Sequence, residues 1–185
     1  GPIRDKGIHH GAMKNRSTWK ERRDQEKRRL GITEQPYCLI VGGGQGGLML
    51  AARLKMLGVP ALVVEKNARI GDSWRNRYRT LVLHDPVWYD HFPYLPFPDH
   101  WPVFTPKDKM GDWMEAYASV MELDCWTSAE VTHASFNQVT QQWRVVVQHD
   151  GKDKLVTPAQ LVFATGSYGP PRHVPLEGAE NFPGV

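Results

Sequence analysis

The stretch that decides the fold is Tyr37-Cys38-Leu39-Ile40-Val41-Gly42-Gly43-Gly44-Gln45-Gly46-Gly47. Its apolar first half has the length of a buried parallel strand. From Gln45 to Leu57, apolar residues recur at helical spacing until a glycine and a proline end the segment. The run Ala61-Leu62-Val63-Val64 then has the composition of a second strand, and Glu65 closes it. The order strand, tight turn, helix, strand predicts a βαβ unit in an α/β domain with a parallel sheet.

Three glycines in this stretch have the spacing of a phosphate-binding turn. Gly42, Gly44 and Gly47 satisfy the pattern G-x-G-x-x-G between the predicted strand and helix. The first glycine permits a tight turn, the second lets a pyrophosphate approach the backbone, and the third lets helix and strand pack closely. The helix N-terminus adds oriented N–H groups and partial positive charge. The glycines therefore predict a dinucleotide site in a Rossmann-like domain.

Glu65 supports the same interpretation. It ends the second predicted strand eighteen residues after Gly47, where a carboxylate can accept hydrogen bonds from the hydroxyls of an adenosine ribose. A lone glycine-rich turn often does no more than join two packed elements, but here strand, helix and acid agree. These residues alone leave FAD and NAD open as the ligand.

The middle of the chain predicts a long loop followed by a helix. Residues 69–106 are dense in aromatic residues and prolines, which exclude a long helix or a central strand. Because long irregular segments are often functional, we expect this one to line a binding site, and a cover over the core is the alternative. Residues 107–122 return to helical character, with an apolar side formed by Met110, Trp113, Met114, Tyr117 and Met121.

The last third of the chain predicts strands of two kinds. A small antiparallel sheet, inserted into the α/β domain, is expected from Ala129–Thr132, Trp143–Val147 and Lys154–Val156. A hairpin turn at 149–152, with the sequence His-Asp-Gly-Lys, joins the last two of these strands. Leu161–Ala164 is expected to add one more buried strand to the parallel sheet.

Charge is distributed unevenly along the 185 residues. Residues 1–30 hold ten Lys or Arg against four acidic residues. The acids interleave with the bases at helical spacing, so residues 14–35 are predicted to form a basic, solvated helical extension rather than a nucleic-acid-binding segment. Residues 1–13 resemble an expression-vector remnant and are excluded from the fold.

Cysteine content and hydropathy exclude several classes of protein. Cys38 and Cys125 are the only cysteines, which excludes a disulfide framework and a cysteine-rich metal site, and we expect no metal. No apolar stretch approaches the roughly 20 residues that span a bilayer, and the N-terminus lacks the apolar core of a signal peptide. We therefore expect a cytoplasmic protein without a membrane or nucleic-acid partner, whose basic extension could dock on another domain or subunit.

Several further segments resemble the flavin-containing monooxygenases, a family of class B flavoprotein monooxygenases. After Glu65, the family's Gly-x-x-Trp pattern is matched from Gly71 to Trp74. The resemblance covers residues 36–185 and continues through Leu81–Pro86, Phe92–Pro98 and Phe163–Gly166. It is strongest to the branch that includes the YUCCA-type enzymes. The resemblance implies that residues 36–185 are an FAD-binding domain and that FAD, rather than NAD, occupies the glycine motif.

The resemblance also implies which residues contact FAD. The glycine turn would hold the pyrophosphate, Glu65 the ribose, Trp74 and Arg75 would flank the flavin, and the main chain of Val131 would contact adenine. The full set is Gly42, Gly44, Gln45, Gly46, Gly47, Glu65, Lys66, Trp74, Arg75, His84, Asp85, Val131, Ala164, Thr165 and Gly166.

His84 is the candidate catalytic residue. It stands where animal members of the family have an asparagine facing the flavin. The alternative is a histidine with a structural role, whose ring nitrogens are hydrogen-bonded within the protein. Members of the family reduce FAD with NADPH and transfer one oxygen atom of O2 to a small organic substrate. The resemblance therefore implies the FAD-binding part of an NADPH- and O2-dependent flavin monooxygenase.

The C-terminus departs from the family pattern. Phe182 and Gly184 resemble the opening of the family's F-x-G-x-x-x-H signature, whose histidine would fall beyond Val185. A second glycine motif, for NADPH, is also missing. We therefore expect a chain truncated before an NADPH-binding domain, with little NADPH-driven turnover of its own. The alternatives are a stand-alone FAD-binding module that works with a partner, and a reductase that does not activate oxygen.

Overall fold

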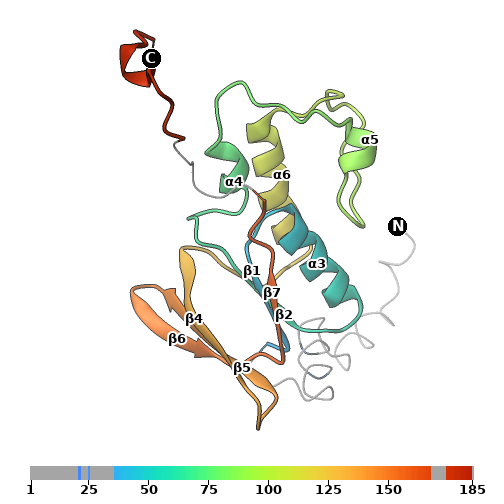
Figure 1. Ribbon diagram of the computed structural model, residues 1–185. Coiled ribbons are helices and arrows are strands. Elements are labelled where there is room, and N and C mark those ends of the chain that lie inside the picture. The colour runs from blue at the N-terminus through green and yellow to red at the C-terminus, as the bar shows by residue number, and fades with distance from the viewer. Residues whose placement is uncertain (1–20, 22–24, 26–35, 168–173, 185) are drawn as a thin grey trace, which may run out of the picture.

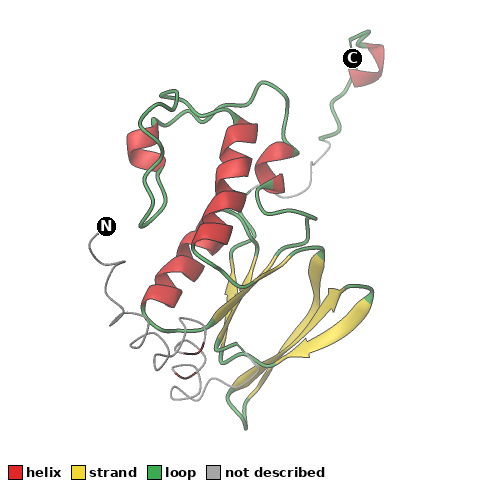
Figure 2. Cartoon of the chain, turned by 180° about the vertical axis from the view of Figure 1, so that it is seen from behind, coloured by secondary structure: helices red, strands yellow, loops and turns green. Residues whose placement is uncertain are grey.

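The structure, a computed structural model, describes residues 21, 25, 36–167 and 174–184. The predicted basic extension and the remnant before it lie outside the described residues, apart from Glu21 and Gln25. The described chain is built in three layers, with helices on one face of a parallel sheet and an antiparallel sheet on the other (Figures 1 and 2).

The central layer is a parallel sheet with the strand order β3-β2-β1-β7. Its strands are β1 (Cys38–Val41), β2 (Ala61–Val64), β3 (Cys125–Trp126) and β7 (Gln160–Phe163). Helix α3 (Gln45–Met56) connects β1 to β2, which pair in parallel, so the predicted βαβ unit is confirmed. The sequence did not predict β3, because two residues are too few to show a periodic pattern.

The second layer is an antiparallel sheet of β4 (Ala129–Asn137), β5 (Gln142–His149) and β6 (Lys152–Val156). Asp150 and Gly151 form the turn between β5 and β6, with φ angles of 53° and 70°. Two successive positive φ angles are typical of the two-residue type I′ hairpin, so the predicted turn is confirmed. Strand β4 continues to Asn137, well beyond the predicted end at Thr132. The sequence did not predict this second half, because a register shift between Val131 and His133 interrupts the alternation that marks a strand.

The third layer is formed by α3 and α6 (Lys107–Val120). The long aromatic segment crosses above it with two single-turn helices, α4 (Asp72–Arg75) and α5 (Val87–Asp90), and a short 3-10 helix, η1 (Ala179–Asn181), lies near the C-terminus. Phe92 and Phe97 are buried in the same core cluster as Met110, Met114 and Tyr117 of α6. The predicted helix is therefore confirmed with its apolar side inward, and the loop is ordered by its own aromatic rings.

Strands β1 and β2 are buried on both faces, whereas β7, which the sequence predicted as a buried strand, is an edge strand in which Gln160 and Phe163 are exposed. Cys38, Ile40 and Val63 pack against α3, whereas Leu39 and Val64 pack against the antiparallel sheet. Strands covered on both faces read as continuous apolar runs, which is the pattern that the sequence shows at β1 and β2. Among the described residues, no helix is both long and apolar enough to cross a membrane.

Candidate cofactor site

The strand order places a topological switch point, here called the cofactor crevice, at the carboxyl ends of β1, β2 and β7. From β1 the chain continues to β2 and β3 on one side, whereas β7 lies on the other side of β1. In open α/β sheets, ligands bind outside the carboxyl ends of the strands at such a reversal. The glycine turn follows β1, Glu65 follows β2, and the segment 164–166 follows β7. Residues far apart in the sequence therefore meet at one edge.

Two of the motif glycines are required by close packing. Gly42 has a φ angle of 114°, and a Cβ atom built on it would lie 2.8 Å from the carbonyl carbon of Ala164, after β7. Gly47, in the first turn of α3, is buried, and its Cβ would overlap the carbonyl oxygen of Gly42. Side chains at these positions would push β1, β7 and α3 apart.

The second motif glycine faces open space. A Cβ on Gly44 would meet no atom within 4 Å, and the same holds for Gly46. Gly44 is the N-cap of α3, with φ −78° and ψ −172°, and no side chain of the described residues caps this helix. The first four N–H groups of a helix have no partner inside it, and the first turn of α3 contains no acidic residue. Backbone donors and an open approach together fit a pyrophosphate.

Glu65 is held at the end of β2 by backbone hydrogen bonds. The N–H groups of Gly43 and Asn67 each donate to a different carboxylate oxygen, both at 2.8 Å, and the residue is 7% exposed. Its own N–H donates to the carbonyl of Trp126 at 2.8 Å, and its carbonyl accepts from Ala129 at 3.0 Å. Each carboxylate oxygen keeps a further lone pair for a ribose hydroxyl. Glu65 is therefore preset in position and orientation.

The sequence did not single out Gly43 or Asn67. A Cβ on Gly43 would lie 2.8 Å from Cδ1 of Ile70 and 3.0 Å from Cβ of Glu65. The turn residue between two motif glycines therefore connects the crevice to the segment before α4. The sequence signal for Gly43 was a further glycine between Gly42 and Gly44, which the G-x-G-x-x-G pattern does not require. Lys66 is exposed beside Glu65.

Helix α4 presents Trp74 and Arg75 in different environments. Trp74 is partly buried against the main core cluster, and the Arg77 guanidinium carbon lies 4.6 Å from its ring centroid. The Arg75 side chain is 13% exposed and pairs with Asp72 and Asp112, both at 2.9 Å. Burial disfavours the charged guanidinium, but the hydrogen bonds to Asp72 and Asp112 outweigh it and raise the pKa of Arg75. The guanidinium is thus directed towards α6.

The remaining predicted residues are less closely gathered. The side chain of His84 is 94% exposed, with Nε2 3.6 Å from Oδ2 of Asp85. Val131 packs between the two sheets on β4, two residues after Ala129. Thr165 and Gly166 are exposed beyond β7, and Gly166 has a φ angle of 81°. The structure brings segment 164–166 to the glycine turn through Ala164, whose N–H donates to Val41 at 2.8 Å.

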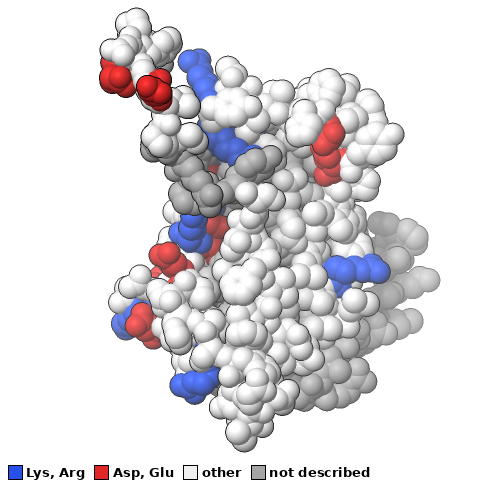
Figure 3. All heavy atoms as spheres, viewed as in Figure 1, with Lys and Arg blue, Asp and Glu red and all other residues white. Residues whose placement is uncertain are grey.

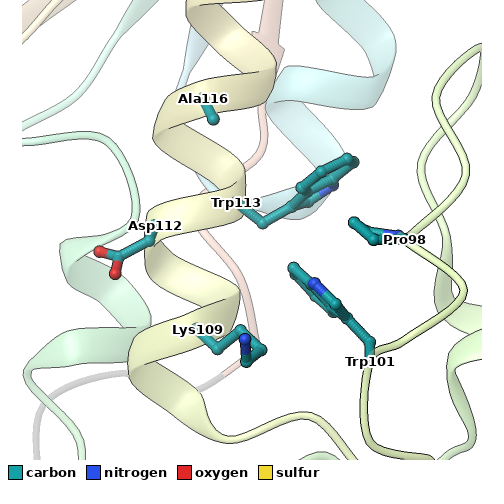
Figure 4. A pocket seen from close by; sticks show the side chains of 6 residues that line it. All are labelled: Pro98, Trp101, Lys109, Asp112, Trp113 and Ala116. Atoms are coloured by element: carbon teal, nitrogen blue, oxygen red, sulfur yellow. The ribbon is translucent and has the colours of Figure 1, made fainter.

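A hollow of about 460 Å³ lies elsewhere, between α6 and the aromatic segment. Figure 4 shows Trp113, Trp101 and Pro98 facing one another on one side of α6, with Asp112 pointing away from them. The lining residues are Pro98, Trp101, Lys109, Asp112, Trp113 and Ala116, and none belongs to the carboxyl edge of the sheet. Among the described residues, the free N–H groups of the first turn of α3 and the carboxylate of Glu65 lie together at the glycine turn and not at this hollow.

Charge and metal-binding groups add little to the site. On the face in Figure 3, Lys and Arg side chains lie singly and do not gather into a continuous patch. Within residues 36–167 and 174–184, no group of three or more His, Cys, Asp or Glu side chains could hold a metal ion. Among the described residues, the groups gathered at the glycine turn are the backbone donors of α3 and the carboxylate of Glu65.

Comparison with known proteins identifies the family. The model of the flavin-binding monooxygenase-like family matches residues 39–185. The chain belongs to this family. Indole-3-pyruvate monooxygenase YUCCA1 of Oryza sativa subsp. japonica is 37% identical over 161 residues, which are 86% of this chain and 38% of that protein. The family assignment confirms the resemblance seen in the sequence, and this member of the flavin-binding family spans less than two fifths of the curated relative.

Solved structures agree on the fold. A mutant flavin monooxygenase from Stenotrophomonas maltophilia has a TM-score of 0.71 at 21% identity, covering 83% of this chain and 45% of that one. OTEMO, solved in complex with FAD and NADP, has a TM-score of 0.65 at 22% identity, covering 80% and 29%. The predicted fold class, a Rossmann-like domain with a parallel sheet and a small antiparallel sheet, is confirmed.

Proposed function

We propose that this chain is the FAD-binding part of an NADPH- and O2-dependent flavin monooxygenase acting on a small organic substrate. The observation that carries the proposal is the crevice at the switch point between β1 and β7. There the open backbone at Gly44 and the preset carboxylate of Glu65 are the two groups that an adenosine pyrophosphate requires. Membership of the flavin-binding family makes FAD the ligand.

The chain's own residues would bind and orient the cofactor. The first-turn N–H groups of α3 would hold the pyrophosphate, Glu65 the ribose hydroxyls, and the backbone at 164–166 would pass close to the isoalloxazine. Trp74 would lie beside the ring, and His84 with Asp85 would border it from the aromatic segment. When bound, FAD supplies the redox and oxygen chemistry, and the protein positions it and limits access of water.

Several wider statements belong to the same proposal. We assign residues 36–185 to an FAD-binding domain, and NADPH binding to a part of the full protein outside this chain. The relatives are monooxygenases more than twice as long, which supports that division. We also propose a cytoplasmic location, because the chain has only two cysteines and so no disulfide framework. Docking of the basic N-terminal extension on another domain or subunit rests on its composition.

The test is FAD binding by the 185-residue chain. The purified, desalted protein is mixed with FAD, separated from free flavin and examined by visible absorption. ADP should compete with FAD because it carries the same adenosine and pyrophosphate, and riboflavin should not compete. ADP with a 2′-phosphate should compete less well than ADP, because Glu65 would repel the added phosphate. Absence of bound flavin, or competition by riboflavin alone, would contradict the proposal.

A further inference from the structure

We infer that Arg75 and Lys107 are positioning residues, which clamp α4 to α6 and so hold Trp74 and the wall of the cofactor crevice in place. The inference rests on the proposed function. It gives Arg75 a role through its neighbours on α6 rather than through contact with the flavin.

Arg75 binds groups on both sides of the α4 turn. Its NH1 group donates to the carbonyl of Ile70 at 2.9 Å and to Asp72 at 2.9 Å. Its NH2 group donates to Asp112 at 2.9 Å and to Glu115 at 3.1 Å, both on α6. A guanidinium presents donors in a rigid fork, so one side chain can fix several acceptors at once. Arg75 thereby ties the start of α4 to the middle of α6.

Lys107 closes the other end of the turn. Its ammonium donates to the carbonyl of Arg75 at 2.7 Å and to Asp108 at 2.7 Å, and its side chain is only 10% exposed. Burial of a lysine ammonium costs free energy unless the group is paired. The two hydrogen bonds offset this cost and fix the side chain in position. The last residue of α4 is therefore capped by the first residue of α6.

Two glycines let these helices approach closely. Gly71, the N-cap of α4, has a φ angle of 93°, and its Cβ would lie 2.8 Å from Cα of Gly111 on α6. A Cβ on Gly111 would lie 2.9 Å from the carbonyl oxygen of Gly71 and 2.8 Å from Cγ of Arg75. The ion pairs of Arg75 therefore connect two helices whose backbones are in direct contact at Gly71 and Gly111.

The clamp acts on the crevice through Ile70. Arg75 holds the carbonyl of Ile70, and the side chain of Ile70 lies against Gly43, whose N–H donates to Glu65. The same turn carries Trp74, packed on the core beside α6. If the clamp opened, Trp74 would lose its fixed place and Gly43 would lose a neighbour. The cofactor crevice is therefore held in shape from outside by α6.

The experiment compares Arg75→Lys with Arg69→Lys in the 185-residue chain. Both changes keep the positive charge and reduce the number of hydrogen-bond donors in the side chain. Arg69 also binds Glu115, but its side chain is 55% exposed and bonds to no carbonyl of α4. A second variant, Lys107→Met, removes the cap at the other end. Hydrogen exchange of residues 70–77, FAD affinity and the fluorescence of bound flavin are measured for each.

We expect Arg75→Lys and Lys107→Met to speed exchange in residues 70–77 and to weaken FAD binding about tenfold. Fluorescence of the bound flavin should rise as the quenching indole of Trp74 moves away. Arg69→Lys should change affinity less than about threefold. Parent-like exchange, affinity and fluorescence in both variants would overturn the clamp and leave the proposed function standing. A parent chain that binds no FAD would overturn the proposed function, while the exchange measurement still tests the clamp.

Discussion

The motif glycines are expected to separate into two functional types when each is changed to alanine. Gly47→Ala places a methyl group on the carbonyl oxygen of Gly42, with a further contact of 3.2 Å to the carbonyl carbon. Both atoms belong to backbone that cannot rotate away, so α3 must shift from β1. Overpacking of this kind costs about 1–3 kcal/mol, and at 3 kcal/mol it lowers the melting temperature of a domain of this size by about 6–12 °C.

Gly44→Ala should have the opposite profile. Its φ of −78° suits alanine and its Cβ meets nothing, so stability should change by less than about 1 kcal/mol. The methyl group would, however, enter the approach of the pyrophosphate and weaken FAD binding about 10- to 100-fold. Gly46→Ala is a control for stability alone, because its Cβ is also free and alanine favours the helix by about 0.5–1 kcal/mol.

The assay is thermal unfolding of the ligand-free chain together with FAD titration for all three variants. Gly47→Ala should lose stability, Gly44→Ala affinity, and Gly46→Ala should gain stability. If Gly44→Ala bound FAD as tightly as the parent, the assignment of the pyrophosphate to this turn would be refuted. If Gly47→Ala kept the parental melting temperature, the argument from close packing would be wrong.

Three further predictions concern single side chains. Glu65→Gln replaces one acceptor oxygen with a donor that faces a backbone N–H, so urea unfolding should show a loss of about 1–3 kcal/mol and FAD binding should weaken. The pKa of Glu115 is lowered by its hydrogen bond to Arg69, so its stabilising contribution is present above the ordinary glutamate pKa of about 4.3 and is lost as the pH falls through the lowered value; Glu115→Gln should flatten the pH dependence of unfolding there. Burial raises the pKa of Cys125 to about 12 and also raises that of Cys38, so a thiol reagent at pH 8 should react with neither until the chain is unfolded.

The sequence predicted most of what local chemistry determines. The glycine turn and the strands β1 and β2 could be predicted because tight turns and burial on both faces restrict residue type. The hairpin was readable because only a few residue pairs, here Asp150 and Gly151, tolerate two positive φ angles. Glu65 was found from its distance to the last glycine.

The rest depends on contacts that leave no local pattern. Strand β3 has two residues and exists because its backbone pairs with β2 and bonds to Glu65. Helices α4 and α5 are single turns, too short for a helical period. Two partners of Arg75, Asp112 and Glu115, lie 37 and 40 residues away on α6, so this part of its environment could not be inferred from the neighbouring sequence. Non-local ion pairs become visible only when the fold is known.

The register shift in β4 divides the strand into two parts, and the side chains that face the core have odd numbers in the first part and even numbers in the second. Ala129 and Val131 turn inward at odd positions, whereas beyond the shift Ala134 turns inward at an even position. Deletion of Thr132 would remove the extra residue and restore strict alternation with the later side chains on their present faces, whereas regular pairing that kept Thr132 would turn every later side chain to the opposite face. The bulge therefore separates the two ends of β4. A change of length towards the β4–β5 turn can be accommodated at the bulge without moving Ala129, whose N–H donates a hydrogen bond to the carbonyl of Glu65 at the crevice.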